Sequence, residues 1–417
     1  MFTSLKLKDW RQFDNVDIAF DEHMTILTGA NGSGKTTLLN VLGRHFGWIA
    51  EIASTPKLDD EGSLLYDTDY HISEYEQERL EQKNKMIQGS YAIGEIHYDV
   101  EKTCNIRVPQ TAGTTYQLLL DGQQEQKGIF LSSHRNVFHY QNVSNIPAKA
   151  IKREEAHSGY SRYLLGRYNE EWMGNETGAT RQIKRTLISW AVYGYGNNAV
   201  KADNTAKEMF EGFQNVLSML LSPSLGYEKL EIDSPEVILK TSTGDFAIDA
   251  VSGGIAALIE IAWQIFMCGK QDEKFTVVFD EPENHLHPEL QRNLMPSLMK
   301  AFPNVQFVVA THNPFVIGSV EMSKVYVLNY NDDKRVDSFC LEDVNKAGTA
   351  NEILRDVLGI PVTFGGWVEE RLDQIAAKYV KREITEESIK ELKKELKGIG
   401  MESYIPESII KVMEAKK

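Results

Sequence analysis

Apolar and polar residues alternate along the first 30 residues in the manner of β-strands. The runs FTSLKLKDW and VDIAF show this period of two, and the more apolar run MTILTG leads into a glycine-rich stretch. The next run, KTTLLNVLGRHFGW, spaces its apolar residues as a helix does. The pattern therefore predicts a strand, a glycine-rich loop and a helix around residue 30.

The pattern changes in the next hundred residues. Residues 51–90 are acidic and rich in turn formers, which predicts a surface segment of loop and helix. The runs GEIHYDV, NIRVP and YQLLLDG again have period two and predict a small antiparallel group. GIFLSSHR then predicts a buried strand that ends in a polar turn.

The second half alternates helical and strand-like patterns. Helical spacing covers residues 160–221, and the strand-like runs KLEIDSPEVILKT and DFAIDAV precede the apolar helix GIAALIEIAWQIFMCG. The strand FTVVFDEPE, the helix PELQRNLMPSLMKAF and the strands VQFVVATHNP and KVYVLNY follow. From about residue 351 the chain is charged and helical. We find no repeats and no low-complexity linker, so we expect insertions rather than tethered domains.

Composition narrows the class of protein. The chain has 417 residues, 42% hydrophobic and 25% charged, which is ordinary for a soluble protein of one large domain or several. Three scattered cysteines favour a reducing compartment. No apolar run approaches the roughly 18 residues of a membrane span, so we expect a cytoplasmic protein without membrane contact. A net charge of −15 argues against a surface made mainly for nucleic acid, although KAIKRE and RQIKR are local basic clusters.

The clearest chemical signal is GANGSGKTT, which fits the phosphate-binding pattern G-x-x-x-x-G-K-[ST] between a strand and a helix. Glycines allow positive φ, so that backbone N–H groups can turn toward phosphate oxygens. Lys35 would reach the β- and γ-phosphates of a nucleotide, and the Thr36 hydroxyl would hold Mg²⁺. The predicted nucleotide-binding set is Gly29, Asn31, Gly32, Ser33, Gly34, Lys35, Thr36 and Thr37.

Two further apolar strands end in chemically active side chains. FTVVFDEPE presents Asp280 as a candidate magnesium ligand and Glu281 as the group that would orient and deprotonate an attacking water. VQFVVATHNP ends at His312, which could contact a γ-phosphate. The stretch DAVSGGIAALIE is ambiguous, because Ser252 at the start of a helix is either an ordinary cap or half of a phosphate-binding site.

Together, GANGSGKTT, VSGG, VVFDEPENHLHP and VVATHNPF resemble the ATP-binding-cassette (ABC) ATPases, in the branch that includes SMC, RecF and OLD proteins. The likeness covers about residues 1–50 and 225–330. It implies ATP and Mg²⁺ as cofactors, a Walker A motif around Lys35, and a Walker B pair of Asp280 and Glu281. It also implies that Glu281 and the switch residue His312 are catalytic.

The same resemblance assigns a further group of residues. The signature motif would be Ser252, Gly253 and Gly254, which in this family completes the ATP site of a second molecule, so that the protein is at least a homodimer. Residues 284–288 fall at the D-loop. Arg11 and Phe13 fall where such proteins contact the nucleotide base. For the Q-loop, which contributes to nucleotide and Mg²⁺ binding, Gln141 is the first choice and Gln88 its rival. Val251 and Ile255 depart from the usual Leu and Gln or Glu that flank the signature.

The fold that this resemblance implies is an α/β ABC-ATPase head, with a P-loop core sheet and an antiparallel β subdomain. We expect an N-terminal lobe over residues 1–150, a helical insertion over 151–225, a C-terminal lobe over 226–345, and a helical tail over 346–417 that serves partner or oligomer contacts.

No long coiled coil and no Toprim nuclease constellation are evident in the sequence. A stand-alone cassette of this kind resembles the ATPase subunit (PtuA) of Septu-type anti-phage systems, including the retron-associated form, in which an HNH nuclease is the separate effector. A PARIS-type ATPase with a Toprim effector is the close rival. A RecF- or SMC-like repair ATPase that binds DNA directly is the second alternative, and a transporter-associated cassette is the least supported.

Overall fold

The computed structural model describes residues 1–59, 62–70, 89–110, 113–168, 178–270, 272–341, 350–354, 366–380, 385–401, 404–405, 408–409 and 412. The chain forms two compact units, Met1–Ile353 and Leu354–Lys417. The division of the first unit into two lobes and an insertion, as expected from the sequence, stays a prediction.

Five neighbouring strands form the parallel core of an 11-stranded sheet, in the order β17-β3-β16-β15-β11. They are β3 (Met24–Gly29), β11 (Gly128–Leu131), β15 (Phe275–Asp280), β16 (Val305–Ala310) and β17 (Lys324–Tyr330). Every residue of β3, β15 and β16 is buried, as expected for central parallel strands that are covered on both faces. Helix α1 (Lys35–Gly43) follows β3 directly, as predicted.

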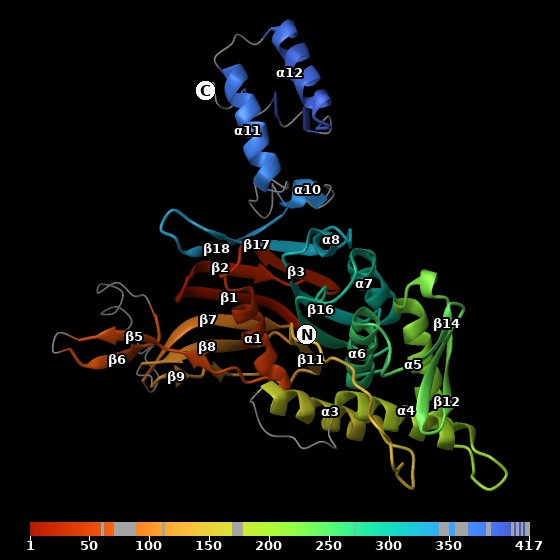
Figure 1. Ribbon diagram of the computed structural model, residues 1–417. Coiled ribbons are helices and arrows are strands. Elements are labelled where there is room, and N and C mark those ends of the chain that lie inside the picture. Colours follow the sequence, from red (N-terminus) through yellow and green to blue (C-terminus); the bar gives the residue numbers. More distant parts are fainter. Residues whose placement is uncertain are drawn as a thin grey trace. The chain divides into compact units, whose positions relative to one another are not determined.

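The N-terminal strands and the period-two group extend the same sheet (Figure 1). These strands are β1 (Phe2–Trp10), β2 (Phe13–Ala19), β7 (Ser90–Tyr98), β8 (Thr103–Pro109) and β10 (Leu119–Asp121). Their antiparallel pairing is confirmed. Among the strands of this sheet, β18 (Val336–Cys340) was not predicted. It pairs with β17 on one side and with β2 on the other, and so joins the antiparallel part to the parallel core. The predicted α/β class is therefore confirmed.

Short strands occupy part of the acidic segment, where the sequence predicted loop and helix. They are β4 (Ile52–Ala53), β5 (Thr55–Leu58) and β6 (Leu64–Asp67), and β4 pairs with β9 (Thr115–Tyr116). β5 and β6 form a hairpin of their own. The expectation is wrong for these residues, because cross-strand pairing stabilises segments whose composition alone favours turns.

Helices and a small sheet complete the first unit. The helices are α3 (Arg153–Tyr168), α4 (Ala179–Tyr195), α5 (Asn204–Leu220), α6 (Gly253–Cys268), α7 (Pro288–Ala301), α8 (Pro314–Ile317) and α10 (Ala350–Glu352). The small sheet consists of β12 (Tyr227–Asp233), β13 (Glu236–Thr241) and β14 (Gly244–Ala247). Buried aromatic rings join three of the helices: Trp190 on α4 and Phe213 on α5 both contact Trp263 on α6, with ring centroids 5.6 Å and 5.2 Å away. In Figure 1, α3 and α4 lie below the core sheet.

The second unit contains α11 (Gly366–Val380) and α12 (Glu386–Gly398), as the helical pattern of the tail predicted. Its core consists of Val368, Leu372, Ile375, Ala376, Tyr379, Leu392, Leu396, Met401 and Val412. Within the described ranges of both units, no helix combines the length and the apolar character that a membrane span requires.

Candidate functional site

The parallel register brings four chain segments to one edge of the core sheet. Asp280 at the end of β15 is opposite Ala310 of β16, and Ala310 is opposite Leu27 of β3. Leu131, the last residue of β11, pairs with Phe279. Because the strands are parallel, the segments that follow them emerge side by side. The glycine-rich loop, Asp280–Glu281, Thr311–His312 and residues 132–135 therefore share one edge.

The glycine-rich loop requires glycine at two positions in particular. Gly29 and Gly34 have φ of 136° and 97°, in the region that side chains rarely adopt. A Cβ on Gly29 would lie 2.3 Å from the Leu328 carbonyl oxygen, and one on Gly34 would lie 2.3 Å from the Phe13 ring. The loop is thus held closely against β17 and the start of β2, in a conformation that suits a phosphate cradle.

Lys35 lies folded over this loop. Its Nζ donates to the carbonyl oxygens of Gly29 (2.9 Å) and Ala30 (3.0 Å). Burial lowers the pKa of Lys35, and the nearby carboxylates of Glu281 and Asp280 oppose this effect. A phosphate oxygen would offer this ammonium group a charged partner in place of two carbonyl groups.

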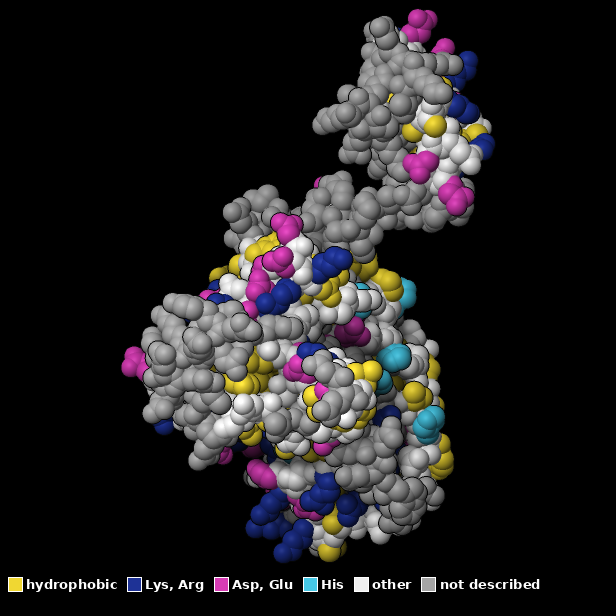
Figure 2. All heavy atoms as spheres, turned by 90° about the vertical axis from the view of Figure 1, so that its left-hand side faces the viewer, with side chains coloured by type: hydrophobic (Ala, Val, Ile, Leu, Met, Phe, Trp, Pro, Cys, Tyr) yellow, Lys and Arg dark blue, Asp and Glu magenta, His cyan; other side chains and the backbone are white. Residues whose placement is uncertain are grey.

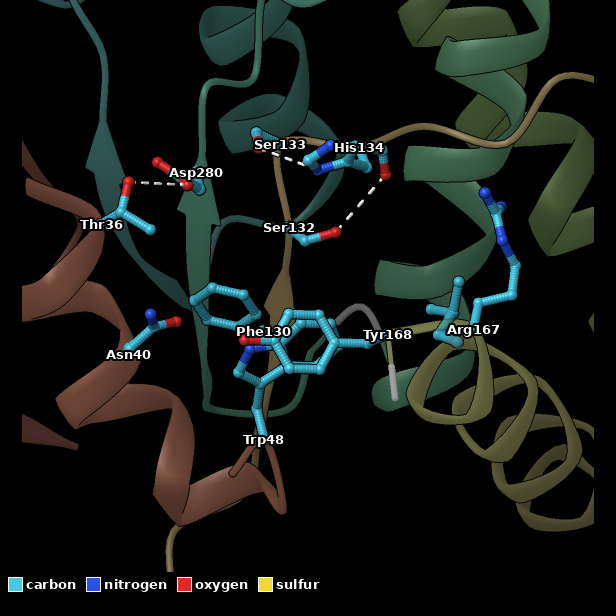
Figure 3. A pocket seen from close by; sticks show the side chains of 11 residues that line it. Thr36, Asn40, Trp48, Phe130, Ser132, Ser133, His134, Arg167, Tyr168 and Asp280 are labelled. Carbon is cyan, nitrogen blue, oxygen red and sulfur yellow. Dashed lines mark hydrogen bonds between the residues drawn. The ribbon is translucent and has the colours of Figure 1, made fainter. Parts of the chain in front are cut away.

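Thr36 and Asp280 meet as the residues of a magnesium site would. The Thr36 hydroxyl donates to Asp280 Oδ2 at 3.0 Å, across a sequence separation of 244 residues (Figure 3). A hydroxyl and a carboxylate leave room for phosphate and water oxygens, which is the mixed oxygen set that Mg²⁺ takes in nucleotide sites. The donor set fits Mg²⁺, and both residues are those that the sequence predicted.

Burial makes ionised Asp280 unfavourable in the folded chain. It raises the pKa of Asp280 from 3.8 to about 6, the hydrogen bond from Thr36 lowers the pKa, and Glu281 raises it again. The folded chain therefore retains a proton at pH values where the unfolded chain has released it. This contribution to stability is complete below about pH 4 and is lost as the pH rises through about 6.

Asp280→Asn should therefore stabilise the nucleotide-free chain at pH 7, by about 2–4 °C in the unfolding midpoint, while it abolishes Mg²⁺-dependent nucleotide binding. The gain should shrink as the pH falls from 7 toward 4. Thermal unfolding in EDTA across this pH range measures the effect, with Asp233→Asn at an exposed carboxylate as the control. A gain in the unfolding midpoint that does not depend on pH would contradict a raised pKa of Asp280 as its cause.

Glu281 is oriented by two neighbours. Its Oε2 accepts from Asn284 Nδ2 at 2.9 Å, and its Oε1 lies 3.4 Å from His312 Nδ1. The residue has φ of 44°, an uncommon conformation for a side chain other than Asn, Asp or Gly. Such strain is found where the surroundings impose a functional position. The structure thus brings together the two predicted catalytic residues, Glu281 and His312.

Two buried residues of this edge were not among the predicted site residues. Glu283 Oε1 accepts from the Thr311 hydroxyl at 2.6 Å, which ties the segment after β15 to the one after β16. Arg135 Nη2 donates to the carbonyl oxygens of Asp280 (3.3 Å) and Glu281 (3.2 Å). The sequence carried a weak signal for Glu283, the third acid of DEPE, and none that distinguished Arg135 from a surface arginine.

A cavity of about 360 Å³ adjoins the Thr36–Asp280 pair. Trp48 and Phe130 stack along its floor with ring centroids 4.8 Å apart, and Tyr168 lies 4.5 Å from Trp48 (Figure 3). The other lining residues are Asn40, Ser132, Ser133, His134, Leu164 and Arg167. The polar turn after β11, rather than a glutamine, therefore lies beside Thr36 and Asp280.

The structure places the first Q-loop candidate away from this cavity. Gln141 is not among the residues that line this cavity; its backbone N–H donates to Asp249 Oδ2 at 3.1 Å, and its side-chain amide lies against Gly178. The rival, Gln88, lies outside the described residues. The turn after β11 reaches the site within four residues of the strand, whereas Gln141 lies ten residues beyond it, and the assignment of Gln141 to the Q-loop stays a prediction.

Comparison with known proteins agrees with this geometry. Two family models described as AAA domains match the chain, one over residues 4–157 and the other, whose description names the AbiEii toxin and Type IV TA systems, over residues 235–318. The Retron Ec83 probable ATPase of Escherichia coli is 22% identical over 403 residues, or 78% of this chain and 70% of that protein. The Septu protein PtuA of Bacillus thuringiensis is 20% identical over 377 residues, or 86% of this chain and 84% of that protein.

Among solved structures, the SMC head domain from Thermotoga maritima matches at 14% identity with a TM-score of 0.40, over 82% of this chain and 99% of that chain. The sequence relatives and the family models decide the matter. The chain is an ABC-class ATPase related to Septu PtuA and to retron ATPases. The resemblance predicted from the motifs is thereby confirmed.

In this ATPase the signature residues lie apart from the Thr36–Asp280 cavity. None of Ser252, Gly253 and Gly254 lines it. Ser252 is the N-cap of α6, but its side chain makes no capping hydrogen bond. Gly253 needs no left-handed φ, and a Cβ there would meet no atom within 4 Å. The helix cap itself therefore explains neither residue type, and the assignment of both residues to a signature motif stays a prediction.

The base-contact assignment has partial geometric support in the ATPase. Arg11 and Thr37 line one small cavity, beside α1. Phe13 is buried and touches the glycine-rich loop at Gly34, so its observed role is to support that loop. Whether Arg11 contacts a base stays a prediction.

A buried cation anchors the segment that leads into the signature. Lys184 on α4 donates from Nζ to Asp249 Oδ2 (2.7 Å) and to Glu236 Oε2 (2.6 Å), and its side chain is fully buried. Burial opposes its charge, but these hydrogen bonds outweigh burial and raise the pKa of Lys184. One lysine of the basic cluster RQIKR is thus a structural group of the ATPase rather than a surface charge.

Proposed function

We propose that this ATPase is a nucleotide-controlled assembly switch, in which two copies enclose two ATP molecules and the nucleotide state regulates a partner effector nuclease in anti-phage defence. The observation that carries the dimer is the signature: Ser252 and Gly253 are exposed at the start of α6, and packing within the chain explains neither. The positive end of a helix with free N–H groups suits a phosphate from a second molecule.

The residues at the sheet edge divide the chemistry between them. The loop amides and Lys35 would bind the β- and γ-phosphates, and Thr36 with Asp280 would hold Mg²⁺. Mg²⁺, when bound, neutralises charge on the phosphate oxygens. Glu281 would orient the attacking water and take its proton, and His312, 3.4 Å from Glu281 through Nδ1, would face the γ-phosphate. Slow turnover is part of the proposal, because a switch needs a long-lived ATP state.

The proposed effector class rests on the resemblance to Septu-type systems and not on a site in this chain. Septu PtuA and a retron ATPase match most of the chain, so we favour a separate HNH-type nuclease; a Toprim nuclease is the alternative. Co-expression of the tagged ATPase with the product of its neighbouring open reading frame tests this. We expect an HNH protein to co-purify, and its DNA cleavage to differ between ATP and ADP. An effector that elutes separately and cleaves equally with both nucleotides would refute the regulation.

Direct DNA binding is the second candidate function. Figure 2 shows Lys and Arg side chains gathered at the lower end of one face, with acidic side chains over other parts of it. Lys149 and Lys152 are exposed, as the basic cluster KAIKRE predicted. A repair-type ATPase would bind DNA with ATP, and its affinity would fall steeply as salt rises. Filter binding at two salt concentrations separates this candidate from the switch.

A further inference from the structure

The signature helix α6 carries a buried acid whose partners lead to the ATP site. Glu260 lies two turns after the start of α6 and is 1% exposed. A carboxylate in that position is costly unless its oxygens accept hydrogen bonds. Burial raises the pKa of Glu260, and hydrogen bonds from its neighbours act in the opposite direction.

Asn136 supplies two of those hydrogen bonds. Its backbone N–H donates to Glu260 Oε2 at 2.8 Å, and its side-chain amide donates to Oε1. Tyr160 on α3 donates its hydroxyl to Oε1 at 2.9 Å. Asn136 is itself only 6% exposed, so this contact is shielded from water and strong.

The preceding residue, Arg135, contacts the segment that follows β15. Its guanidinium donates to the carbonyl oxygens of Asp280 and Glu281, and lies 5.0 Å from the centroid of the Phe279 ring. Within the described chain, its Nε is buried without a hydrogen-bond partner. An unmet buried donor is unfavourable, and a small shift of this segment could satisfy it.

A third contact ties the same segment to the catalytic carboxylate. Asn284 Nδ2 donates both to the Ser133 carbonyl oxygen (3.1 Å) and to Glu281 Oε2 (2.9 Å). Residues 133–136 therefore contact Glu281 through Asn284, the Asp280–Glu281 backbone through Arg135, and α6 through Asn136.

We propose that Arg135 and Asn136 are positioning residues that couple the Walker B segment to the signature helix of the same chain, so that ATP at one site of a dimer adjusts the signature that serves the other site. The two residues are joined by one planar peptide bond, which keeps their Cα atoms at a fixed separation. Glu260 and the N-cap, Ser252, belong to one continuous α-helix, so a shift of α6 at Glu260 would also move Ser252. The inference rests on the proposed function.

The test uses hydrogen exchange of the full chain, at a concentration where light scattering shows a monomer. MgATP should slow exchange of the α6 amides 257–263 by at least about threefold in the wild type, although they are not residues of the ATP cavity. Asn136→Asp places a second carboxylate against Glu260 and should abolish this response, with MgATP affinity within about twofold of the wild type. The exchanged pair, Asn136→Asp with Glu260→Gln, restores an amide–carboxylate contact and should therefore restore the slower exchange of the α6 amides with MgATP.

The outcomes are distinct. Absence of MgATP binding by the wild type would refute the proposed function. MgATP binding without slower exchange of the α6 amides would overturn the coupling. So would a loss of this response in Asn136→Asp that the exchanged pair does not restore. If Asn136→Asp does not fold, Glu260→Gln alone serves, because it keeps the shape and removes the charge-assisted acceptor; a full response in that variant would also overturn the coupling. Asn215→Asp, at an exposed position of α5, is the matched control.

Discussion

Replacing Glu281 by Gln is expected to lower ATP turnover by at least about 100-fold and to leave a long-lived ATP-bound dimer. The substitution keeps the side chain's size and its contact with Asn284, but an amide cannot take a proton from water. Phosphate binding by the glycine-rich loop and Lys35 does not depend on that proton. Binding and dimerisation should therefore survive while hydrolysis stops.

Two measurements on one preparation check this expectation. Phosphate release gives the turnover, and size-exclusion chromatography with light scattering gives the mass with ATP and Mg²⁺. Glu125→Gln, at an exposed carboxylate, is the control and should match the wild type in both. A Glu281→Gln variant that stays monomeric with ATP would contradict the dimer, and one that keeps full turnover would contradict the role of Glu281.

Gly253→Glu should abolish ATP-driven dimerisation and leave ATP binding by the monomer within about twofold of the wild type. The substitution does not harm the monomer, because a Cβ at Gly253 meets nothing within 4 Å. Glu also favours the helix more than Gly does, and an acid in the first turn suits the helix dipole. Across a dimer interface, however, the same carboxylate would face the phosphates of the second molecule and repel them.

A fluorescent ATP analogue measures monomer binding, and light scattering measures the dimer. Asn204→Glu is the matched control, since it adds an acid at the first residue of α5, also at an exposed helix start. Normal dimerisation of Gly253→Glu would favour the alternative that VSGG is an ordinary helix cap. A monomer that has lost ATP binding would instead show that Gly253 acts within its own chain.

Much of the site could be predicted because its chemistry is local. The glycine-rich loop combines three glycines of positive φ with Lys35 and Thr36 in one short run, and each residue type is required by phosphate or Mg²⁺. Asp280 ends one buried strand and His312 follows another, and parallel strands present their ends at one edge. The contact of Asp280 with Thr36 and that of His312 with Glu281 follow from this arrangement.

Other contacts could not be predicted from the local sequence pattern. Arg135, Glu283 and Lys184 look like surface charges in the sequence, yet each is buried against partners far along the chain. The analogy predicted a glutamine near Mg²⁺ and gave no sign that the polar turn of Ser132, Ser133 and His134 lines the cavity beside Thr36 and Asp280. Strand β18 was missed because it lies between β17 and β2, and β2 is more than 300 residues away from it in the sequence.

The sequence by itself determined the class of this protein, its phosphate loop and its acidic pair, and it predicted a signature motif, because those features depend on residues that are neighbours along the chain. Only the tertiary structure decided that the turn after β11 lies beside Thr36 and Asp280, and that helix α6 contacts the segment that follows this turn. Those contacts, such as Asn136 with Glu260 and Lys184 with Asp249, stabilise charges that burial would otherwise penalise, and burial is a property of the folded chain alone.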